Sequence, residues 1–300
     1  MSAGSEGLQP WDGHDLFALL TLEAIDPSHF RSRYASENAR GSVFGGQLLG
    51  HAVMAASMTV PPDRDVTAMQ LFFSQSAIPD RPIDFEVTAI QEGKRFSSRH
   101  VRGTQSGGRL VLDAQVMFAL PLLGPQHATA APAIGVDPNT LMRLDELPIE
   151  ISDAVWQTLG YPFDSSALDL RLADPAQGLG LDAHSTRLRF WLRARNELPD
   201  NSNVQAAAFA YLSDWWLNFS TVGIHVRQMQ HDGTRLHVAS LNHSIWFHRP
   251  LLADRWLHFD IQSPCAASGR GLSIATVHDV EGVLVASATQ ENLMTPLGST

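Results

Sequence analysis

Asp214 is the residue whose neighbours in the sequence most suggest chemistry. It closely follows an apolar run, 206–212, that predicts a buried helix. A carboxylate is costly to bury without partners, and a buried one can accept a proton from water. The alternative is an acid at the end of a helix that reaches solvent, and the residues around Asp214 alone favour that alternative.

Other kinds of catalytic centre have little support in the sequence. There is no Gly-x-Ser-x-Gly pattern, which disfavours a serine hydrolase of the α/β-hydrolase type. Thirteen histidines occur, but no Cys/His spacing resembles a zinc site. The run 178–183, Gly-Leu-Gly-Leu-Asp-Ala, faintly resembles a dinucleotide fingerprint, yet a strand-like run follows it where a helix is required. We therefore expect neither a metal nor a nicotinamide cofactor.

Composition narrows the class of protein further. A chain of 300 residues with 44% hydrophobic content can build two ordinary domains. Its net charge of −10 disfavours nucleic acid and anionic lipid as partners. The single cysteine, Cys265, cannot form an internal disulfide, and neither a secretory start nor an 18-residue apolar stretch occurs. These features predict a cytoplasmic protein without a membrane span.

An internal repeat organises the chain. A shift of 174 positions lays Phe247 on Phe73, Phe259 on Phe85 and Leu284-Val285 on Leu110-Val111. Two units of the same kind pack most simply as pseudo-symmetric halves with a cleft between them. Function is then expected where the two copies differ in polar residues.

The predicted elements follow the same order twice, a long apolar helix and then a run of strands. The first helix spans 45–58 and the second 203–217; the strands are expected at 69–73, 82–90, 97–103 and 110–118, and at 186–194, 236–247, 256–262, 272–278 and 283–290. A helix wrapped by a curved antiparallel sheet is a hotdog, so the prediction is an α+β double hotdog with two long central helices. Its domains are 1–123 and 185–300, joined by a linker, 124–184, with one short helix near 154–159.

Six sequence blocks carry a family resemblance. They are Val43-Phe44-Gly45-Gly46-Gln47, Gly93-Lys94-Arg95-Phe96-Ser97-Ser98-Arg99, Tyr211-Leu212-Ser213-Asp214, His243-Ser244-Ile245-Trp246-Phe247-His248-Arg249-Pro250, Gly269-Arg270-Gly271 and Gln290-Glu291. In this order, over 15–295, they resemble the signature blocks of type II acyl-CoA thioesterases. The resemblance implies hydrolysis of fatty acyl-CoA to free acid and CoA. It assigns the catalytic groups to Asp214, Ser240 and Gln290.

The sequence supports a catalytic role for Ser240 and Gln290 only in combination with Asp214. Each alone is an ordinary polar residue of a strand. Together, a carboxylate could take a proton from water while a hydroxyl and an amide hold that water in line with a thioester carbonyl. The 174 shift places Val116 opposite Gln290. We therefore expect one site per chain, in the C-terminal domain.

Substrate contacts are expected at glycines and arginines. Gly45, Gly46 and Gln47 offer free backbone N–H groups for an oxyanion, although the glycines could equally serve close helix packing. Arg99 and Arg270 are candidates to bind the CoA phosphates. The commoner alternative is that they are arginines on strands that simply face solvent. The expected partners are acyl-CoA and further copies of the chain in a homo-oligomer.

The chain also departs from the family pattern. The usual Phe-Leu-Arg/Lys-Pro-Gly run is Phe73-Ser74-Gln75-Ser76-Ala77 here, and the usual Asp-His-Ser begins with Asn242. Trp215 and Trp216 follow Asp214, and at most one of them is expected to face the acyl tunnel, because adjacent helical residues point about 100° apart. Two alternatives stay open: a hydratase, which would need a His where Phe219 stands, and a non-catalytic acyl-CoA-binding protein.

Overall fold

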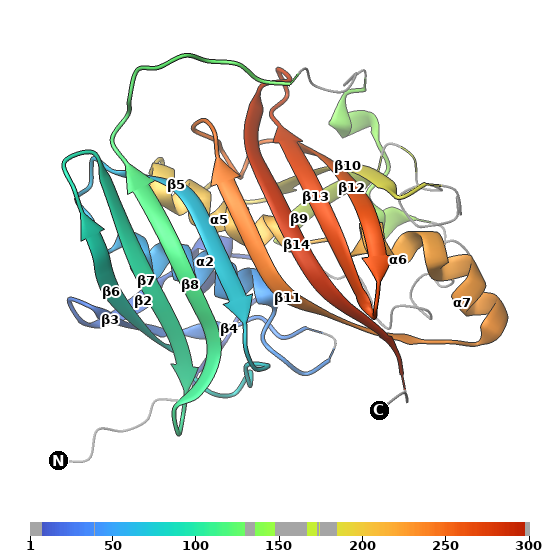
Figure 1. The fold of residues 1–300 in the computed structure, drawn as a ribbon, viewed down its shortest axis with the longest axis horizontal. Helices are drawn as coiled ribbons and strands as arrows, with labels where there is room; N and C mark the ends of the chain where they lie inside the picture. Colours follow the sequence, from blue (N-terminus) through green and yellow to red (C-terminus); the bar gives the residue numbers. More distant parts are fainter. Residues whose placement is uncertain are drawn as a thin grey trace.

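A single 12-stranded antiparallel sheet forms the body of the protein. The computed structural model describes residues 8–38, 40–129, 136–147, 167–172, 174 and 185–297. The strand order is β2-β3-β6-β7-β8-β5-β11-β14-β13-β12-β10-β9, and every neighbouring pair is antiparallel (Figure 1). This confirms the expectation of one extended sheet. A separate parallel pair joins β1 (Gln9–Pro10) to β4 (Tyr34–Ala35).

The sheet consists of two related halves that meet at β5 and β11. The first half contains β2 (Leu22–Asp26), β3 (His29–Ser32), β5 (Asp65–Phe73), β6 (Asp84–Glu92), β7 (Phe96–Gln105) and β8 (Arg109–Ala119). The second contains β9 (Leu168–Leu172), β10 (Arg187–Ala194), β11 (Leu236–Phe247), β12 (Leu257–Ala267), β13 (Arg270–His278) and β14 (Leu284–Pro296). Read outward from the β5–β11 seam, both halves have the same succession of strands.

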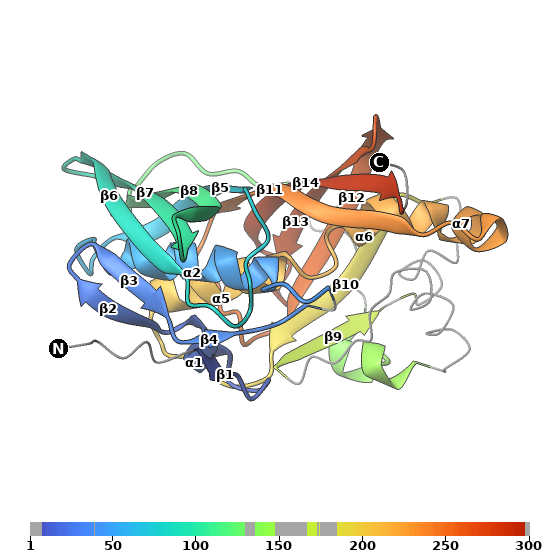
Figure 2. The same cartoon turned by 90° about the horizontal axis from the view of Figure 1, so that it is seen from below.

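Two helices lie side by side against one face of the sheet. They are α2 (Gly45–Ser57) and α5 (Ser202–Ser213), and Figure 2 shows the outer strands of both halves curling beneath them. The shorter helices are α1 (Leu16–Leu20), α6 (Phe219–Val222) and α7 (Val226–Asp232), with 3-10 turns η1 (Pro138–Thr140), η2 (Leu144–Glu146) and η3 (Gly223–His225). No helix among the described residues has the length and apolar character needed to cross a membrane.

Glycines of α2 allow the two helices to approach closely. A Cβ placed on Gly46 would lie 2.5 Å from the carbonyl oxygen of Tyr211, and one on Gly50 would lie 3.0 Å from that of Ala207. Since Gly46 meets a later part of α5 and Gly50 an earlier part, the helices run antiparallel. The start of α2 therefore lies beside the end of α5.

The second helix ends earlier than the sequence predicts. The apolar pattern suggested a helix over 203–217, but α5 stops at Ser213, and Asp214 is its C-cap. Trp216 has a φ of 66°, in the left-handed region that a continuing helix excludes. The expected helix at 154–159 and the glycine-rich run 178–183 lie outside the described residues. Within the section predicted as a linker, η1, η2 and β9 are structured, and β9 pairs with β10.

An insertion distinguishes the two halves. Phe96 and Arg270, which begin β7 and β13, are 174 positions apart (270 minus 96), as the repeat predicts. The helices α2 and α5 begin only 157 positions apart (202 minus 45). The C-terminal half therefore has about 17 more residues between its helix and the strand at the seam. These residues form α6, η3 and α7.

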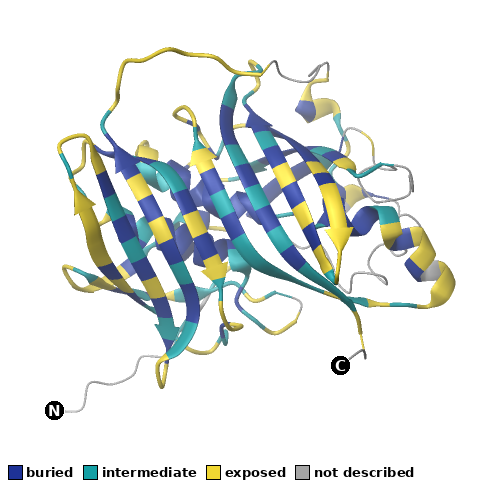
Figure 3. Cartoon of the chain, in the orientation of Figure 1, coloured by how far each residue is buried: buried dark blue, intermediate teal, exposed yellow. Residues whose placement is uncertain are grey.

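One hydrophobic core fills the space between the sheet and the helices. Its aromatic centre is a stack of Phe190, Phe259 and Phe209, with ring centroids 5.0 Å and 6.0 Å apart. Buried and exposed residues alternate along the strands (Figure 3), as expected for a sheet with one covered face. The core thus fixes which strand residues point toward α2 and α5.

Replacing Gly46 with Ala should destabilise the protein by about 1–2 kcal/mol. The gain in helix propensity, about 0.5–1 kcal/mol, is smaller than the cost of overpacking a rigid contact, about 1–3 kcal/mol. The backbone oxygen of Tyr211 cannot rotate away from the new methyl group. The measurement is the free energy of unfolding in urea. Gly124→Ala is the control, because a Cβ there meets nothing within 4 Å; equal stabilities for both variants would contradict the close contact.

Candidate active site

The structure brings Asp214, Ser240 and Gln290 into one hydrogen-bonded cluster. The Nε2 of Gln290 donates to Oδ1 of Asp214 at 2.6 Å and to Oγ of Ser240 at 2.7 Å. The Ser240 hydroxyl in turn donates to the same Asp214 oxygen at 3.4 Å. The three side chains come from the end of α5, from β11 and from β14. Only the folded sheet brings these distant positions together.

A β-bulge turns Ser240 toward the other two residues. Ser240 and His243 are three positions apart, so regular alternation would place them on opposite faces of β11. The pairing of β11 with β14 shifts by one residue between Ser240 and Asn242, and beyond the shift His243 lies opposite Gln290. An extra residue of this kind re-aims the side chains on one side of it. Ser240 and Gln290 therefore face the same helix.

Burial dominates the electrostatics of Asp214. Its side chain is buried at the C-terminal end of α5, which raises its pKa from 3.8 to about 6. Hydrogen bonds from Gln290, Ser240 and the backbone N–H of Gly46 work in the opposite direction. The carboxylate thus has donors but no positively charged partner in the cluster. A base with a pKa near neutrality suits proton transfer at physiological pH.

The three residues expected to bind the oxyanion, Gly45, Gly46 and Gln47, have three different roles in the structure. Gly45 lines the cavity, and a Cβ there would lie 2.5 Å from Oδ2 of Asp214. Gly46 donates its N–H to Asp214. The side chain of Gln47 points elsewhere: it is fully buried and bonds the backbone of Tyr34 and Ser36 at 2.7 Å. The first two positions belong to the site, while Gln47 anchors the segment that precedes α2.

Arg99 lies at the opposite end of α2, away from the cavity. It is 3% exposed and bonds Thr59, which follows α2, and Glu92. The 174 shift makes Arg99 the counterpart of Ser273. Arg99 pairs with Val116 across the sheet as Ser273 pairs with Gln290. Arg99 therefore fills the place in the first half that corresponds to the cluster in the second, and its contacts there are structural.

Two further predicted positions also lie outside the cavity wall. Arg270 is half-exposed and forms an ion pair with Glu291 at 3.2 Å. Asn242, which departs from the family pattern, donates to the same carboxylate at 3.1 Å. The other departure is different, because Ser74, Gln75, Ser76 and Ala77 all line the cavity. That change in sequence therefore alters a surface that can contact a ligand.

A cavity of about 1010 Å³ opens beside the cluster. Asp214 and Ser240 lie in its wall, together with aromatic side chains of both halves: Phe44, Phe73, Tyr211, Trp215, Trp216 and Phe219. Trp216 stacks on Phe219 with centroids 4.6 Å apart, and Trp215 lies 5.1 Å from Phe44. The expectation that only one tryptophan could face the cavity is wrong, because the helix ends before both of them.

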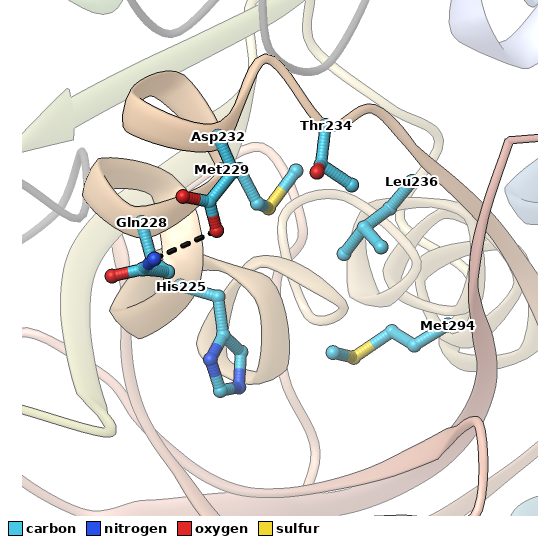
Figure 4. A pocket seen from close by; sticks show the side chains of 7 residues that line it. All are labelled: His225, Gln228, Met229, Asp232, Thr234, Leu236 and Met294. Atoms are coloured by element: carbon cyan, nitrogen blue, oxygen red, sulfur yellow. Dashed lines mark hydrogen bonds between the residues drawn. The ribbon is translucent and has the colours of Figure 1, made fainter.

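A second, smaller cavity of about 240 Å³ lies under α7. Figure 4 shows its lining, in which Met229, Leu236 and Met294 form an apolar part and Gln228 and Asp232 are joined by a hydrogen bond of 2.7 Å. It contains none of the three clustered residues. Leu236 lines both cavities, so the two are neighbours at the start of β11.

Sequence reasoning missed two supports of the cluster. Asn218 lines the large cavity and donates from Nδ2 to Oγ of Ser240 at 3.2 Å. Ser213 contacts Nε2 of the fully buried His243 at 3.0 Å, which fastens the end of α5 to β11. Burial lowers the pKa of His243 to about 3, so it is neutral. Ser213 belongs to one of the six quoted blocks and Asn218 follows that block, but no spacing rule marks the role of either residue.

The extended antiparallel sheet, with the cluster of Asp214, Ser240 and Gln290 beside a cavity, is consistent with the hotdog-fold thioesterases, and comparisons with known proteins point to the same class. The profile of the acyl-CoA thioesterase N-terminal domain matches residues 35–119, and that of the C-terminal domain matches residues 144–294. The chain belongs to the type II acyl-CoA thioesterase family.

Curated relatives and solved structures agree with this assignment. Acyl-CoA thioesterase 2 of Haemophilus influenzae is 29% identical, covering 94% of this chain and 97% of that protein. Human acyl-coenzyme A thioesterase 8 is 27% identical, covering 97% and 92%. The crystal structure of acyl-CoA thioesterase II TesB2 from Mycobacterium marinum has a TM-score of 0.76 at 27% identity, covering 94% and 99%. A hot dog fold protein from Alicyclobacillus acidocaldarius, with a TM-score of 0.72 at 18% identity over 94% and 98%, shares the fold.

Burial of Asp214 should make stability depend on pH. Its pKa is raised in the folded state to about 6, from 3.8, so folding favours the protonated form. The contribution of Asp214 to stability is therefore full below about pH 4 and is lost as the pH rises through about 6. Asp214→Asn should gain stability relative to wild type over that interval, measured by urea unfolding at several pH values. The control is Asp80→Asn, at an exposed carboxylate; parallel curves for wild type and Asp214→Asn would contradict the raised pKa.

Proposed function

We propose that this protein hydrolyses acyl-CoA thioesters to free acids and CoA by direct attack of an activated water. The observation that carries the proposal is the cluster of Asp214, Ser240 and Gln290 in the wall of a large, partly aromatic cavity. Relatives named as acyl-CoA thioesterases or thioester hydrolases support the same substrate class.

The chemistry assigned to the cluster is general base catalysis. Asp214 takes a proton from water as the water oxygen attacks the thioester carbonyl carbon. Ser240 and Gln290 hold the carboxylate, and the backbone N–H of Gly45, at the start of α2, stabilises the oxyanion. Collapse of the tetrahedral intermediate breaks the carbon–sulfur bond. The proton held by Asp214 passes to the departing sulfur, so water and thioester yield acid and thiol.

The two alternative functions are less consistent with the site. A hydratase of this fold would need a histidine five residues after the acid. That position is Phe219, whose ring stacks on Trp216. A purely binding protein would have no use for a buried carboxylate with a pKa near neutrality, since burial of the charged form destabilises the fold.

The architecture is part of the proposal. We assign α2 and α5 as the central helices of two hotdog domains, 1–123 and 185–300, with 124–184 between them. We also propose a homo-oligomer. Apolar side chains are exposed on the outer face near the seam, with Met117 and Trp246 on either side of Ala68 and with Phe72 on the same face of β5. Such a patch favours association between copies.

Asp214→Asn should lower turnover of the best acyl-CoA by about 10²–10⁴-fold, because it retains volume but removes the base. Substrate binding should change little. Wild-type kcat/KM should fall below about pH 6 as the carboxylate becomes protonated. Release of CoA thiol from acyl-CoAs of several chain lengths is the measurement, with Asp80→Asn as the charge-matched control. A folded Asp214→Asn variant with nearly wild-type turnover would exclude this mechanism.

Trp216→Ala should shift preference toward longer acyl chains. Trp216 is buried in the cavity wall, so removing its indole lengthens the space available to the chain. Each added methylene that becomes buried contributes about 0.8 kcal/mol, so two should raise relative kcat/KM for the longer substrate by about tenfold. Trp216→Gly tests the same change while accommodating the left-handed backbone. The control is Trp246→Ala on the outer face. A chain-length profile unchanged in both Trp216 variants would place the acyl chain elsewhere.

A further inference from the structure

Asn218 occupies a position in the site that none of the sequence motifs marks. It follows the end of α5 and is the N-cap of α6, without capping that helix through its side chain. Its Nδ2 donates to Oγ of Ser240 at 3.2 Å, and the residue lines the large cavity. Asn218 lies in the insertion between α5 and β11, which has no counterpart in the N-terminal half.

The donors around Ser240 determine the direction of its hydroxyl hydrogen. A serine hydroxyl has one hydrogen to donate and two lone pairs to accept. Nε2 of Gln290 and Nδ2 of Asn218 both donate to Oγ, which occupies the two lone pairs. The remaining hydrogen then points to Oδ1 of Asp214. Without Asn218 one lone pair is free, and the hydroxyl can rotate away from the carboxylate.

The other atom of the Asn218 amide lacks a partner. Its Oδ1 is buried and accepts no hydrogen bond from the residues that the structure describes. An unsatisfied buried acceptor costs about 1–3 kcal/mol. Asn218 lines the cavity, so a rotation of its side chain that turns this oxygen toward the cavity lets a ligand donor satisfy it. Oε1 of Gln290 is also buried and has no partner among the described residues, but Gln290 does not line the cavity.

A water that attacks a thioester has two hydrogens to place. One goes to the base, Asp214, and the other needs a second acceptor beside the same cavity. Asn218 offers that acceptor next to Ser240. We propose that Asn218 positions both Ser240 and the attacking water. Its amide nitrogen orients the Ser240 hydroxyl toward Asp214, and its amide oxygen accepts the second hydrogen of the water. This assignment rests on the proposed hydrolysis.

The first test is Asn218→Ala in the full chain, assayed by CoA release from acyl-CoAs. Loss of the amide should lower kcat by about 10–100-fold and leave KM within about twofold, because water rather than acyl-CoA loses its contact. Retention of kcat within twofold of wild type would overturn the proposal. Asp214→Asn measured alongside separates the two hypotheses: if it abolishes turnover while Asn218→Ala does not, hydrolysis by Asp214 stands and the role of Asn218 fails.

The second test, Asn218→Asp, gives a readout that a merely structural role would not move. The variant places a second carboxylate on Ser240, and repulsion should raise the pKa of Asp214. The acid limb of kcat/KM should move upward by at least half a pH unit. The same upward shift should appear in the pH dependence of unfolding, which needs no substrate. The exposed control Asn196→Asp adds the same charge outside the cavity wall.

Other titratable groups do not obscure this shift. Burial raises the pKa of Tyr211 to about 12 and lowers that of His243 to about 3, so neither changes charge between about pH 5 and 9. The remaining titratable or charged side chains that line the cavity are Asp12, His14, Glu37, Arg40 and His237. Their contributions are shared by wild type and both variants. An acid limb and an unfolding curve that stay in place in Asn218→Asp would overturn the proposal.

Discussion

The site depends on the burial of one carboxylate at the junction of two helices. Asp214 ends α5 where the start of the antiparallel α2 approaches it, so the backbone N–H of Gly46 donates to its carboxylate. The positive end of a helix dipole and two side-chain donors partly offset the loss of water. Burial still prevails, which keeps the pKa near neutrality. The close approach that makes this possible requires Gly45 and Gly46, because any Cβ at these positions would overlap Asp214 or Tyr211.

Among the described residues, the first half lacks the polar cluster because apolar residues occupy the corresponding positions. The two halves have the same strand order, yet Val66 and Val116 stand where the second half has Ser240 and Gln290. The place beside Val116 contains the guanidinium of Arg99, hydrogen-bonded to Thr59 and Glu92. Polar groups therefore lie at the C-terminal end of the long helix in each half, but they differ between the two halves. The first half has a structural arginine there, and the second has groups that leave a cavity open.

The insertion after α5 shapes the cavity wall next to Asp214. Continuation of the helix to residue 217 would have directed Trp215 and Trp216 about 100° apart. Instead, the chain leaves the helix at Asp214 and passes through a left-handed residue. Both tryptophans and Asn218 then reach the same cavity. The local backbone thus determines the composition of the cavity wall next to the acid.

The sequence alone determined the strand repeat, the two apolar helix segments and the residue types of the cluster, because hydrophobic period and motif order are local properties. Tertiary structure decided the rest. The bulge in β11 turns Ser240 inward, and the early end of α5 exposes Asp214 to the cavity. Arg99 lies away from the cavity and forms only structural contacts, with Thr59 and Glu92 among its partners. Asn218 could be recognised only when it lay beside Ser240, since its hydrogen bond joins segments from different elements. Such choices depend on which distant backbones pair and how closely they pack, and that information is absent from the spacing of residues along the chain.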